Sequence, residues 1–303
     1  MYFGPSLLRM NKRVLKHSFS LLHVDHVHLT QKWNYKNVIS PYYRLYYIDE
    51  GEGTISDAQK KLKLEPGYIY IIPSFTLCSM HCPSRLSQYF IQFFEESPHG
   101  ISMFQNNRTL IKVPASPYDM ANFERILQIN PGRGINRSDN PTVYEKNVFY
   151  KEYQDLNNRQ SDSVYLETQG IILQLLSRFL EDDHYPLKHS QSIPSKVLEA
   201  MSYIQMNLSE SLTVTHLAQR ANQHQDYFSR QFLQYTGERP LNYIHEKRIE
   251  RAQYLIATTN MIYTDIATQT GFSSLPHFSK LFKKITGITP DNYRKQHTSV
   301  NML

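Results

Sequence analysis

"GFSSLPHFSKLFKKITGITPDNYRKQ", residues 271–296, combines a regular apolar spacing with a strongly cationic composition. Four apolar residues recur at the i, i+3, i+4, i+7 spacing of one buried helical face: Phe278, Leu281, Phe282 and Ile285. Ser274 suits the N-cap, Pro276 suits the first turn, where its missing N–H costs nothing, and Gly287 suits the left-handed residue after a helix. The pattern predicts an amphipathic helix from Ser274 to about Thr286.

Much of this pattern also occurs about fifty residues earlier in the chain. The matching residues are Leu217-Ala218, Phe228, Phe232, Thr236-Gly237 and Pro240 in the first copy, and Ile266-Ala267, Phe278, Phe282, Thr286-Gly287 and Pro290 in the second. The offset is 49 residues at the first pair and 50 from Phe228 onward, so the second copy has one extra residue in its turn. A repeat of this length indicates a duplicated supersecondary unit, here a helix-turn-helix. We therefore predict two helix-turn-helix units.

Residues 240–260 connect the two copies. Pro240 suits the first position of a helix, and one face at helical spacing is formed by Leu241, Ile244, Arg248, Ala252 and Leu255. This segment is therefore predicted to be a long helix that fixes one unit relative to the other.

The region from about Ser195 to Gln296 resembles the DNA-binding domain of the AraC family of bacterial transcription regulators. The resemblance is carried by "LAQRANQHQDYFSRQFLQYTG" (217–237), "RIERAQYLI" (248–256) and "DIATQTGFSSLPHFSKLFKKITGITPDNYR" (265–294), about a third of the chain. It implies a sequence-specific regulator, with activation as the expected effect, that binds double-stranded promoter DNA in the major groove. It also implies a homodimer that contacts RNA polymerase and responds to a small-molecule effector.

A recognition helix presents its N-terminal side chains to base edges in the major groove. The expected DNA-binding residues are Asp226, Tyr227, Ser229 and Arg230 in the first unit, and Leu275, Pro276, His277, Lys280 and Lys284 in the second. Arg230 can bind a guanine bidentately and Lys280 can approach the same atoms as a point charge, with contact to phosphate alone as the alternative for both. Asp226 either accepts from a cytosine amino group or caps its own helix. Leu275 and Pro276 favour apolar contact, for example with a thymine methyl.

The composition is compatible with DNA binding and places the chain in a reducing compartment. The formal net charge is +6, and residues 191–303 contain 12 Lys and Arg against 8 Asp and Glu. No stretch approaches the ~20 apolar residues needed to span a membrane, and the first residues have no apolar signal-peptide core. With only Cys78 and Cys82, a disulfide framework is absent. We expect a cytoplasmic protein without a membrane partner.

The N-terminal part is rich in β-forming residues. Residues 42–55, 61–74 and 86–94 read as short strands, and Pro66-Gly67 suits the centre of a type II turn. Such spacing predicts an all-β barrel or jelly roll. The stretch from Gly67 to Pro73 resembles the cupin-type sensor domain of many AraC relatives. The overall fold expected is α+β, with a cupin-like β-barrel and helical hairpin followed by an all-α domain with two helix-turn-helix units.

No catalytic or metal site is expected in the barrel, and no cofactor. The possible metal ligands are His26, His28, Cys78, His81 and Cys82, but they lack the spacing of a cupin metal motif, and packing is their default role. No nucleophile triad or phosphate-binding glycine loop occurs, so we predict no enzyme. A ligand pocket is the favoured role, because small barrels can enclose one small molecule.

The candidate ligand-binding residues are Trp33, Arg44 and Tyr46, of which the last two share one strand face. The alternative is that all three are ordinary core and rim residues. The family resemblance favours a sugar or another small metabolite as effector. Two other functions stay open: a regulator whose barrel only dimerises or docks a partner, and a metal-dependent cupin enzyme with a DNA-binding appendage.

Two further segments, 116–129 and 166–183, read as amphipathic helices. The second resembles the helices through which sensor domains of the family pair, and its candidate dimerisation residues are Ile172, Leu175, Leu176 and Phe179. Packing against the barrel would produce the same apolar stripe. Residues 139–162 are expected to form a loop, with a helical turn as the alternative. The expected domains are a sensor barrel (1–115), a helical dimerisation region (116–185), a linker (186–194) and the DNA-binding domain (195–303).

Overall fold

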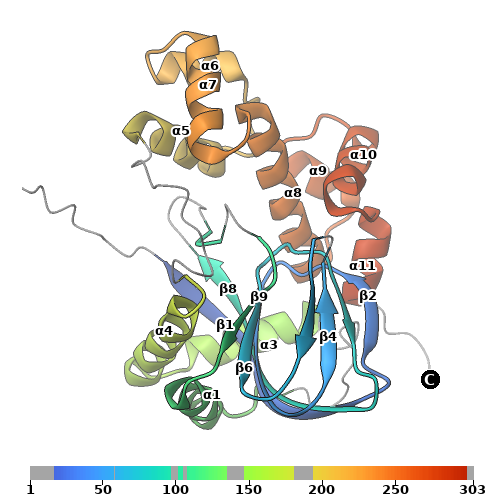
Figure 1. The fold of residues 1–303 in the computed structure, drawn as a ribbon. Helices are drawn as coiled ribbons and strands as arrows, with labels where there is room; N and C mark the ends of the chain where they lie inside the picture. The colour runs from blue at the N-terminus through green and yellow to red at the C-terminus, as the bar shows by residue number, and fades with distance from the viewer. Residues whose placement is uncertain are drawn as a thin grey trace, which may run out of the picture.

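The computed structural model describes residues 17–57, 59–96, 102–104, 108–134, 147–180 and 194–298. Two β-sheets with helices packed against them form its N-terminal part, and helices alone form its C-terminal part (Figure 1). The predicted α+β class is confirmed. The predicted closed barrel is not: the strands form two separate antiparallel sheets.

The larger sheet has five strands in the order β1 (Ser18–Thr30), β8 (Arg85–Glu96), β3 (Tyr43–Gly51), β6 (Tyr68–Ile72) and β9 (Ile111–Pro114). The smaller sheet has four, in the order β2 (Asn34–Val38), β7 (Cys78–His81), β4 (Gly53–Ser56) and β5 (Lys61–Leu64). No described strand of one sheet pairs with a strand of the other, so each sheet keeps two edges.

The side chains between the two sheets form one core, as in a β-sandwich. It includes Trp33, Tyr46, Tyr70, Met80 and Phe90, all buried. The predicted segment 42–55 became two strands, because Gly51 adopts φ +78° and turns the chain between β3 and β4. Gly67 adopts φ +82°, as the predicted turn requires.

The other face of the five-stranded sheet is covered by α1 (Pro117–Ile129) and α4 (Asp162–Ser177). Helix α1 begins with a capping box in which Ser116 and Asp119 each bond the other's backbone N–H. The apolar residues of both helices pack on the sheet, so α1 and α4 belong to the core of the N-terminal half.

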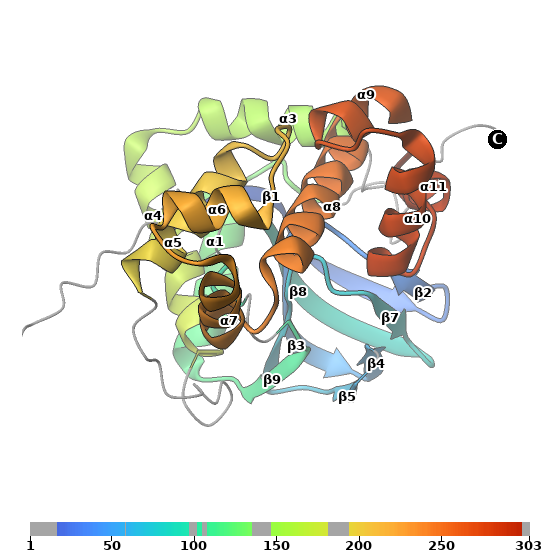
Figure 2. The ribbon, with the colours of Figure 1, turned by 90° about the horizontal axis from the view of Figure 1, so that it is seen from above.

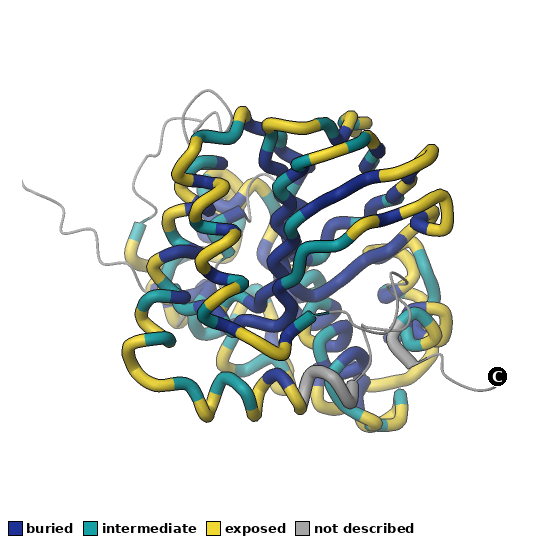
Figure 3. Tube along the Cα trace, turned by 90° about the horizontal axis from the view of Figure 1, so that it is seen from below, coloured by how far each residue is buried: buried dark blue, intermediate teal, exposed yellow. Residues whose placement is uncertain are grey.

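This packing corrects the predicted dimerisation face. The residues concerned, Ile172, Leu175, Leu176 and Phe179, are each at most 2% exposed and lie in the core under the sheet. The apolar stripe is therefore satisfied within one chain, which was the alternative reading. Figure 3 shows the helices alternating between buried and exposed once per turn, with the buried side inward.

Helix α3 (Asn147–Asn158) corrects the prediction for 139–162, which was a loop with at most a helical turn. Its polar composition hid it, but Tyr153 packs against β1, and Asn157 Nδ2 donates to the Leu21 carbonyl at 3.0 Å. The predicted linker 186–194 lies, except for Pro194, outside the described residues.

The C-terminal half is helical throughout. Its helices are α5 (Ser195–Met206), α6 (Val214–Arg220), α7 (Gln225–Thr236), α8 (Pro240–Thr258), α9 (Tyr263–Gln269), α10 (Leu275–Thr286) and α11 (Pro290–Thr298). Figure 2 shows α5–α7 and α9–α11 on opposite sides of α8, which is the connecting helix predicted for 240–260.

The two sides of α8 have different cores. Helices α5–α7 and the start of α8 enclose a core of their own. Helices α9–α11 and the rest of α8 share theirs with the β-sheets, through Leu22, Ile39, Tyr42 and Phe94. The Arg108 guanidinium also pairs with the Glu250 carboxylate of α8 at 2.6 Å. The second helical unit is thus joined to the N-terminal half by apolar contacts, and α8 is joined to it by an ion pair as well.

Candidate nucleic-acid interface

Two helix-turn-helix units are present, α6–α7 and α9–α10, and the sequence repeat extends to their cores. Phe228 and Phe232 lie 5.7 Å apart between ring centroids, and Phe278 and Phe282 lie 5.6 Å apart. The second phenylalanine of each pair meets a tyrosine of the next helix: Phe232 meets Tyr243 at 5.3 Å, and Phe282 meets Tyr293 at 5.5 Å.

Each second helix ends in the same way. The Thr236 hydroxyl donates to the Phe232 carbonyl at 2.7 Å, and the Thr286 hydroxyl donates to the Phe282 carbonyl at 2.8 Å. Gly237 and Gly287 follow, both with φ +81°, in the left-handed conformation that closes a helix. The predicted Thr-Gly stop is confirmed in both units.

In the first unit, α7 presents its expected residues on its first two turns. Asp226, Tyr227 and Arg230 are exposed and Ser229 is half-buried. The N-cap is His224, whose Nδ1 accepts from the Asp226 N–H at 3.4 Å, so Asp226 does not cap its helix. Arg230 forms no ion pair within the described part of the chain, and its guanidinium is open to a ligand.

In the second unit, α10 exposes Leu275, Pro276, His277, Lys280 and Lys284. Ser274 is the N-cap by backbone conformation, although its side chain makes no capping hydrogen bond.

His277 has aromatic neighbours on two elements. Its ring lies 5.6 Å from Phe272 and 6.2 Å from His245 of α8. Partial burial lowers the pKa of His245, and electrostatic repulsion, from Arg248 first, lowers it further. This side of the second unit is therefore a concentration of cationic groups.

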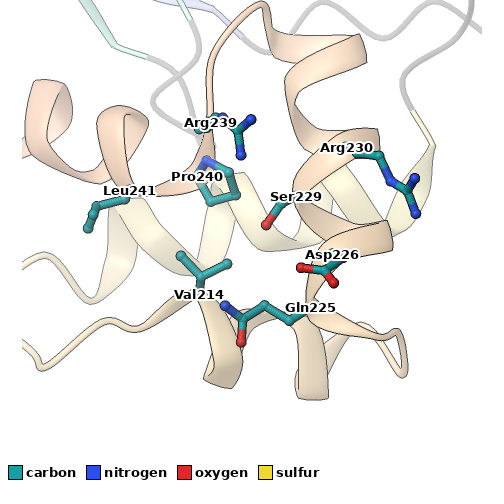
Figure 4. Close-up of a pocket in the computed structure, with 8 residues that line it drawn as sticks. All are labelled: Val214, Gln225, Asp226, Ser229, Arg230, Arg239, Pro240 and Leu241. Carbon is teal, nitrogen blue, oxygen red and sulfur yellow. The ribbon is translucent and has the colours of Figure 1, made fainter.

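A groove of about 520 Å³ lies on the first unit, between α6, α7 and the start of α8 (Figure 4). Its lining includes three of the expected residues, Asp226, Ser229 and Arg230. It also includes two that the sequence reading did not single out: Arg239, the residue before α8, and Gln225, the first residue of α7. Pro240 at the first position of α8 could have pointed to Arg239, because a helix N-terminus is a site for phosphate.

The two units differ in charge. In the second unit α10 carries Lys280, Lys283 and Lys284 and no acidic residue. In the first unit α7 carries Arg230 as its one cation, and Asp226 beside it. Cations attract phosphate whatever the sequence, whereas base edges are read by hydrogen bonds. The arrangement favours backbone contact by α10 and base contact by α7.

The candidate ligand residues Trp33, Arg44 and Tyr46 all lie in the interior of the β-sandwich, each at most 3% exposed. Trp33 and Tyr46 meet edge to face at 6.5 Å. The Arg44 guanidinium bonds the Ser40 hydroxyl and lies 3.5 Å from the Cys78 sulfur. The structure thus brings the three to one region: Arg44 and Tyr46 both lie on β3, and Trp33 lies in the turn between β1 and β2.

The possible metal ligands are dispersed or engaged elsewhere. His26 Nε2 lies 2.8 Å from the Asp49 carboxylate and 3.0 Å from the Ser87 hydroxyl. Cys78 and Cys82 are both buried, and neither forms a disulfide. Within the described residues, no group of three or more His, Cys, Asp or Glu side chains could hold a metal ion.

Comparison with known sequences finds matches to the helical half of the chain. A family model described as "Helix-turn-helix domain" matches residues 217–296. The HTH-type transcriptional regulator YisR of Bacillus subtilis is 39% identical over 97 residues, which are 32% of this chain and 34% of YisR. YobQ of the same organism is 34% identical over 104 residues, 34% of this chain and 43% of YobQ.

An HTH-type transcriptional regulator of Staphylococcus aureus is 30% identical over 144 residues, 47% of this chain and 19% of that protein. The chain thus spans less than half the length of the curated relatives it matches.

Comparison with solved structures covers nearly the whole chain. ToxT from Vibrio cholerae superposes with a TM-score of 0.52 over 94% of this chain and 100% of ToxT, at 15% identity. ToxT with a bound unsaturated fatty acid gives a TM-score of 0.51 over 97% and 100%, at 14% identity. At these identities the likeness concerns the fold, a β domain followed by helix-turn-helix units. Residues 217–296 thus match the helix-turn-helix domain found in known transcriptional regulators, and the whole chain shares the fold of ToxT, in which a β domain precedes the helix-turn-helix units.

Proposed function

We propose that the chain is a sequence-specific DNA-binding regulator of transcription whose β domain binds a small-molecule effector. The observation that supports this most strongly is the pair of helix-turn-helix units, each with exposed side chains on the N-terminal half of its second helix. The proposed DNA-binding region is 195–303, the β domain with its helices is 1–185, and residues 186–194 link them. The expected cellular location is the cytoplasm, where the DNA is. No described helix is long and apolar enough to cross a membrane.

In this proposal the two units divide the work. Helix α7 enters the major groove with Arg230 as the reader of a guanine, and Tyr227 and Ser229 add contacts beside it. Helix α10 holds the phosphate backbone through Lys280, Lys284 and His277, while Leu275 and Pro276 offer apolar contact to a thymine methyl. The groove beside α7 brings Arg239 and the N-terminus of α8 within reach of a phosphate.

Selection of bound sequences from a random duplex library tests this directly. Arg230→Ala should remove the preference at one base position and weaken the selected site by ~1–3 kcal/mol, while Lys284→Ala should weaken all sequences alike. Failure of the wild-type chain to enrich any sequence would refute the proposal. Uniform weakening by Arg230→Ala would make Arg230 a phosphate contact.

The effector part rests on the interior of the β-sandwich. A buried guanidinium such as Arg44 suits an anionic ligand group, because a carboxylate can accept two parallel hydrogen bonds from it. ToxT, which shares the fold, has been crystallised with an unsaturated fatty acid. Carboxylates therefore join sugars and other small metabolites as candidate effectors.

Trp33 supplies the readout, because it is the only tryptophan of the chain and is buried against Tyr46. Titration with sugars, short carboxylates and fatty acids should change the Trp33 emission for the class that binds, together with a rise in melting temperature by mass action. A chain that responds to none of them would favour the second candidate, a β domain that only pairs chains or docks a partner such as RNA polymerase.

A further inference from the structure

A buried arginine lies where the two helix-turn-helix units meet. Arg248 is 9% exposed and sits on α8 between the part of that helix that packs in the first core, ending at Ile244, and the part that packs in the second, beginning at Ile249. The two apolar cores are separate. Their relative orientation must therefore come from α8 itself and from polar contacts across the boundary.

Arg248 makes those contacts. Its Nε donates to the Leu208 carbonyl at 3.0 Å and its Nη2 donates to the Glu210 carbonyl at 2.6 Å, both in the loop between α5 and α6 of the first unit. Its guanidinium also lies 5.8 Å from the ring centre of Phe272, in the turn of the second unit. One side chain thus touches both units, and its partners in the loop are main-chain oxygens.

Gly271 closes the same boundary from the second unit. Its φ is +79°, and a Cβ there would lie 2.2 Å from the Leu208 carbonyl oxygen and 2.6 Å from Arg248 Nη2. The equivalent turn residue of the first unit, 49 positions earlier, is Asn222, with φ +51°. The turn itself therefore tolerates a side chain. Glycine is required at 271 because the loop of the other unit packs directly on it.

We propose that Arg248 and Gly271 are the positioning residues that set the relative orientation of the two helix-turn-helix units, and so the spacing between the two DNA segments that one chain recognises. This inference rests on the proposed DNA binding. Helix α8 alone would leave the first unit attached by its end, since only Tyr243 and Ile244 of α8 belong to the first core. The hydrogen bonds of Arg248 to the loop between α5 and α6 attach the first unit at a second point, one turn further along α8.

The consequence is a selection between DNA sites by geometry. Two linked modules gain affinity from each other only if both can engage at once, and a rigid link favours one spacing over all others. Removing the Arg248 contacts should make the DNA affinity depend less on the spacing between the two segments, with no change in how each unit binds its own segment.

The test uses full-length chain and duplexes in which the distance between the two recognised segments is varied by single base pairs. Arg248→Met and the milder Arg248→Lys remove the two hydrogen bonds from the guanidinium to the loop carbonyls. Arg251→Met is the control, because Arg251 is an exposed cation three residues further along the same helix. Gly271→Asn copies the residue of the first unit, and Gly237→Asn is its control, with φ +81° and nothing within 4 Å of an added Cβ.

Wild type and both controls should prefer one spacing, and Arg248→Met, Arg248→Lys and Gly271→Asn should reduce that preference by about tenfold. Binding to a duplex with a single segment should stay within about twofold in Arg248→Lys. A folded Arg248→Lys protein that keeps the full preference, or controls that lose it equally, would overturn the inference. Absence of DNA binding by the wild type would instead overturn the proposed function, and this inference with it.

Discussion

Replacing the central phenylalanine by alanine should destabilise different extents of the fold in the two helix-turn-helix units. Phe232 and Phe282 are equivalent in the repeat and both fully buried. Each is flanked by two rings at 5.3–5.7 Å, so their local environments are matched. The difference lies beyond these neighbours. Phe232 belongs to a core made only of residues 197–244, whereas Phe282 belongs to the core that the second unit shares with the β-sheets.

Truncation to alanine should cost about 4 kcal/mol in either case. Phe→Ala in a core costs ~3–5 kcal/mol, and rigid aromatic neighbours cannot collapse into the space that is left. Each lost ring pair adds ~0.5–1.5 kcal/mol to the effect of area alone, which favours the upper half of the range. A loss of this size raises the population of opened states roughly a thousandfold.

Regional hydrogen exchange measured by mass spectrometry distinguishes the two variants. Phe232→Ala should accelerate exchange over 195–244 and leave β1 and β8 protected. Phe282→Ala should accelerate exchange over 249–293 and also in the strand segments around Leu22 and Phe94, which share its core. Unchanged protection of these strand segments in Phe282→Ala would refute the idea that the second unit and the sheets form one cooperative core.

Three further outcomes follow from burial and charge. Leu175→Glu should abolish folding, because Leu175 is 0% exposed in the core under the sheet; a folded monomer by circular dichroism and sedimentation would return this helix to the dimer interface. Burial lowers the pKa of His23 to about 3, so its neutral form stabilises the fold above pH ~6.5 and that contribution is lost as the pH falls toward 3. His23→Gln should reduce the slope of stability against pH in this window by up to ~1.4 kcal/mol per unit, and equal slopes in urea unfolding would contradict the assignment. Lys280→Ala should leave the melting temperature unchanged and lower the magnitude of the salt slope of log K by about 0.9; an unchanged slope would mean that Lys280 does not contact DNA.

The helical half was predictable because its signals are local. Apolar spacing, Ser274 before the helix and Gly287 after it were enough to place α10, and the repeat placed α7 by analogy. The groove-facing residues follow from those helices, since the outward side of a helix is fixed once its buried side is known. Whether Asp226 caps its own helix could not be decided from the sequence. The N-cap is His224, a residue type that is not favoured at that position.

The features that the sequence did not reveal depend on contacts between distant segments. Whether the stripe around Leu175 meets a second chain or a sheet cannot be read from its spacing, because both partners bury the same face. Closure of a barrel depends on how edge strands pair, which alternation does not specify. The sequence placed Arg248 on one face of a helix. It could not show the hydrogen bond to the Leu208 carbonyl, forty residues away in the chain, on which the proposed positioning role rests.

Protection of DNA by the full-length chain tests the central claim most directly. Hydroxyl-radical footprinting on a duplex selected for binding should show two protected segments on one face, about one helical turn or ~34 Å apart, because each unit carries its own recognition helix. The same experiment with Arg230→Ala should weaken one of the two. A single protected segment, or none, would contradict the account that both helix-turn-helix units bind DNA.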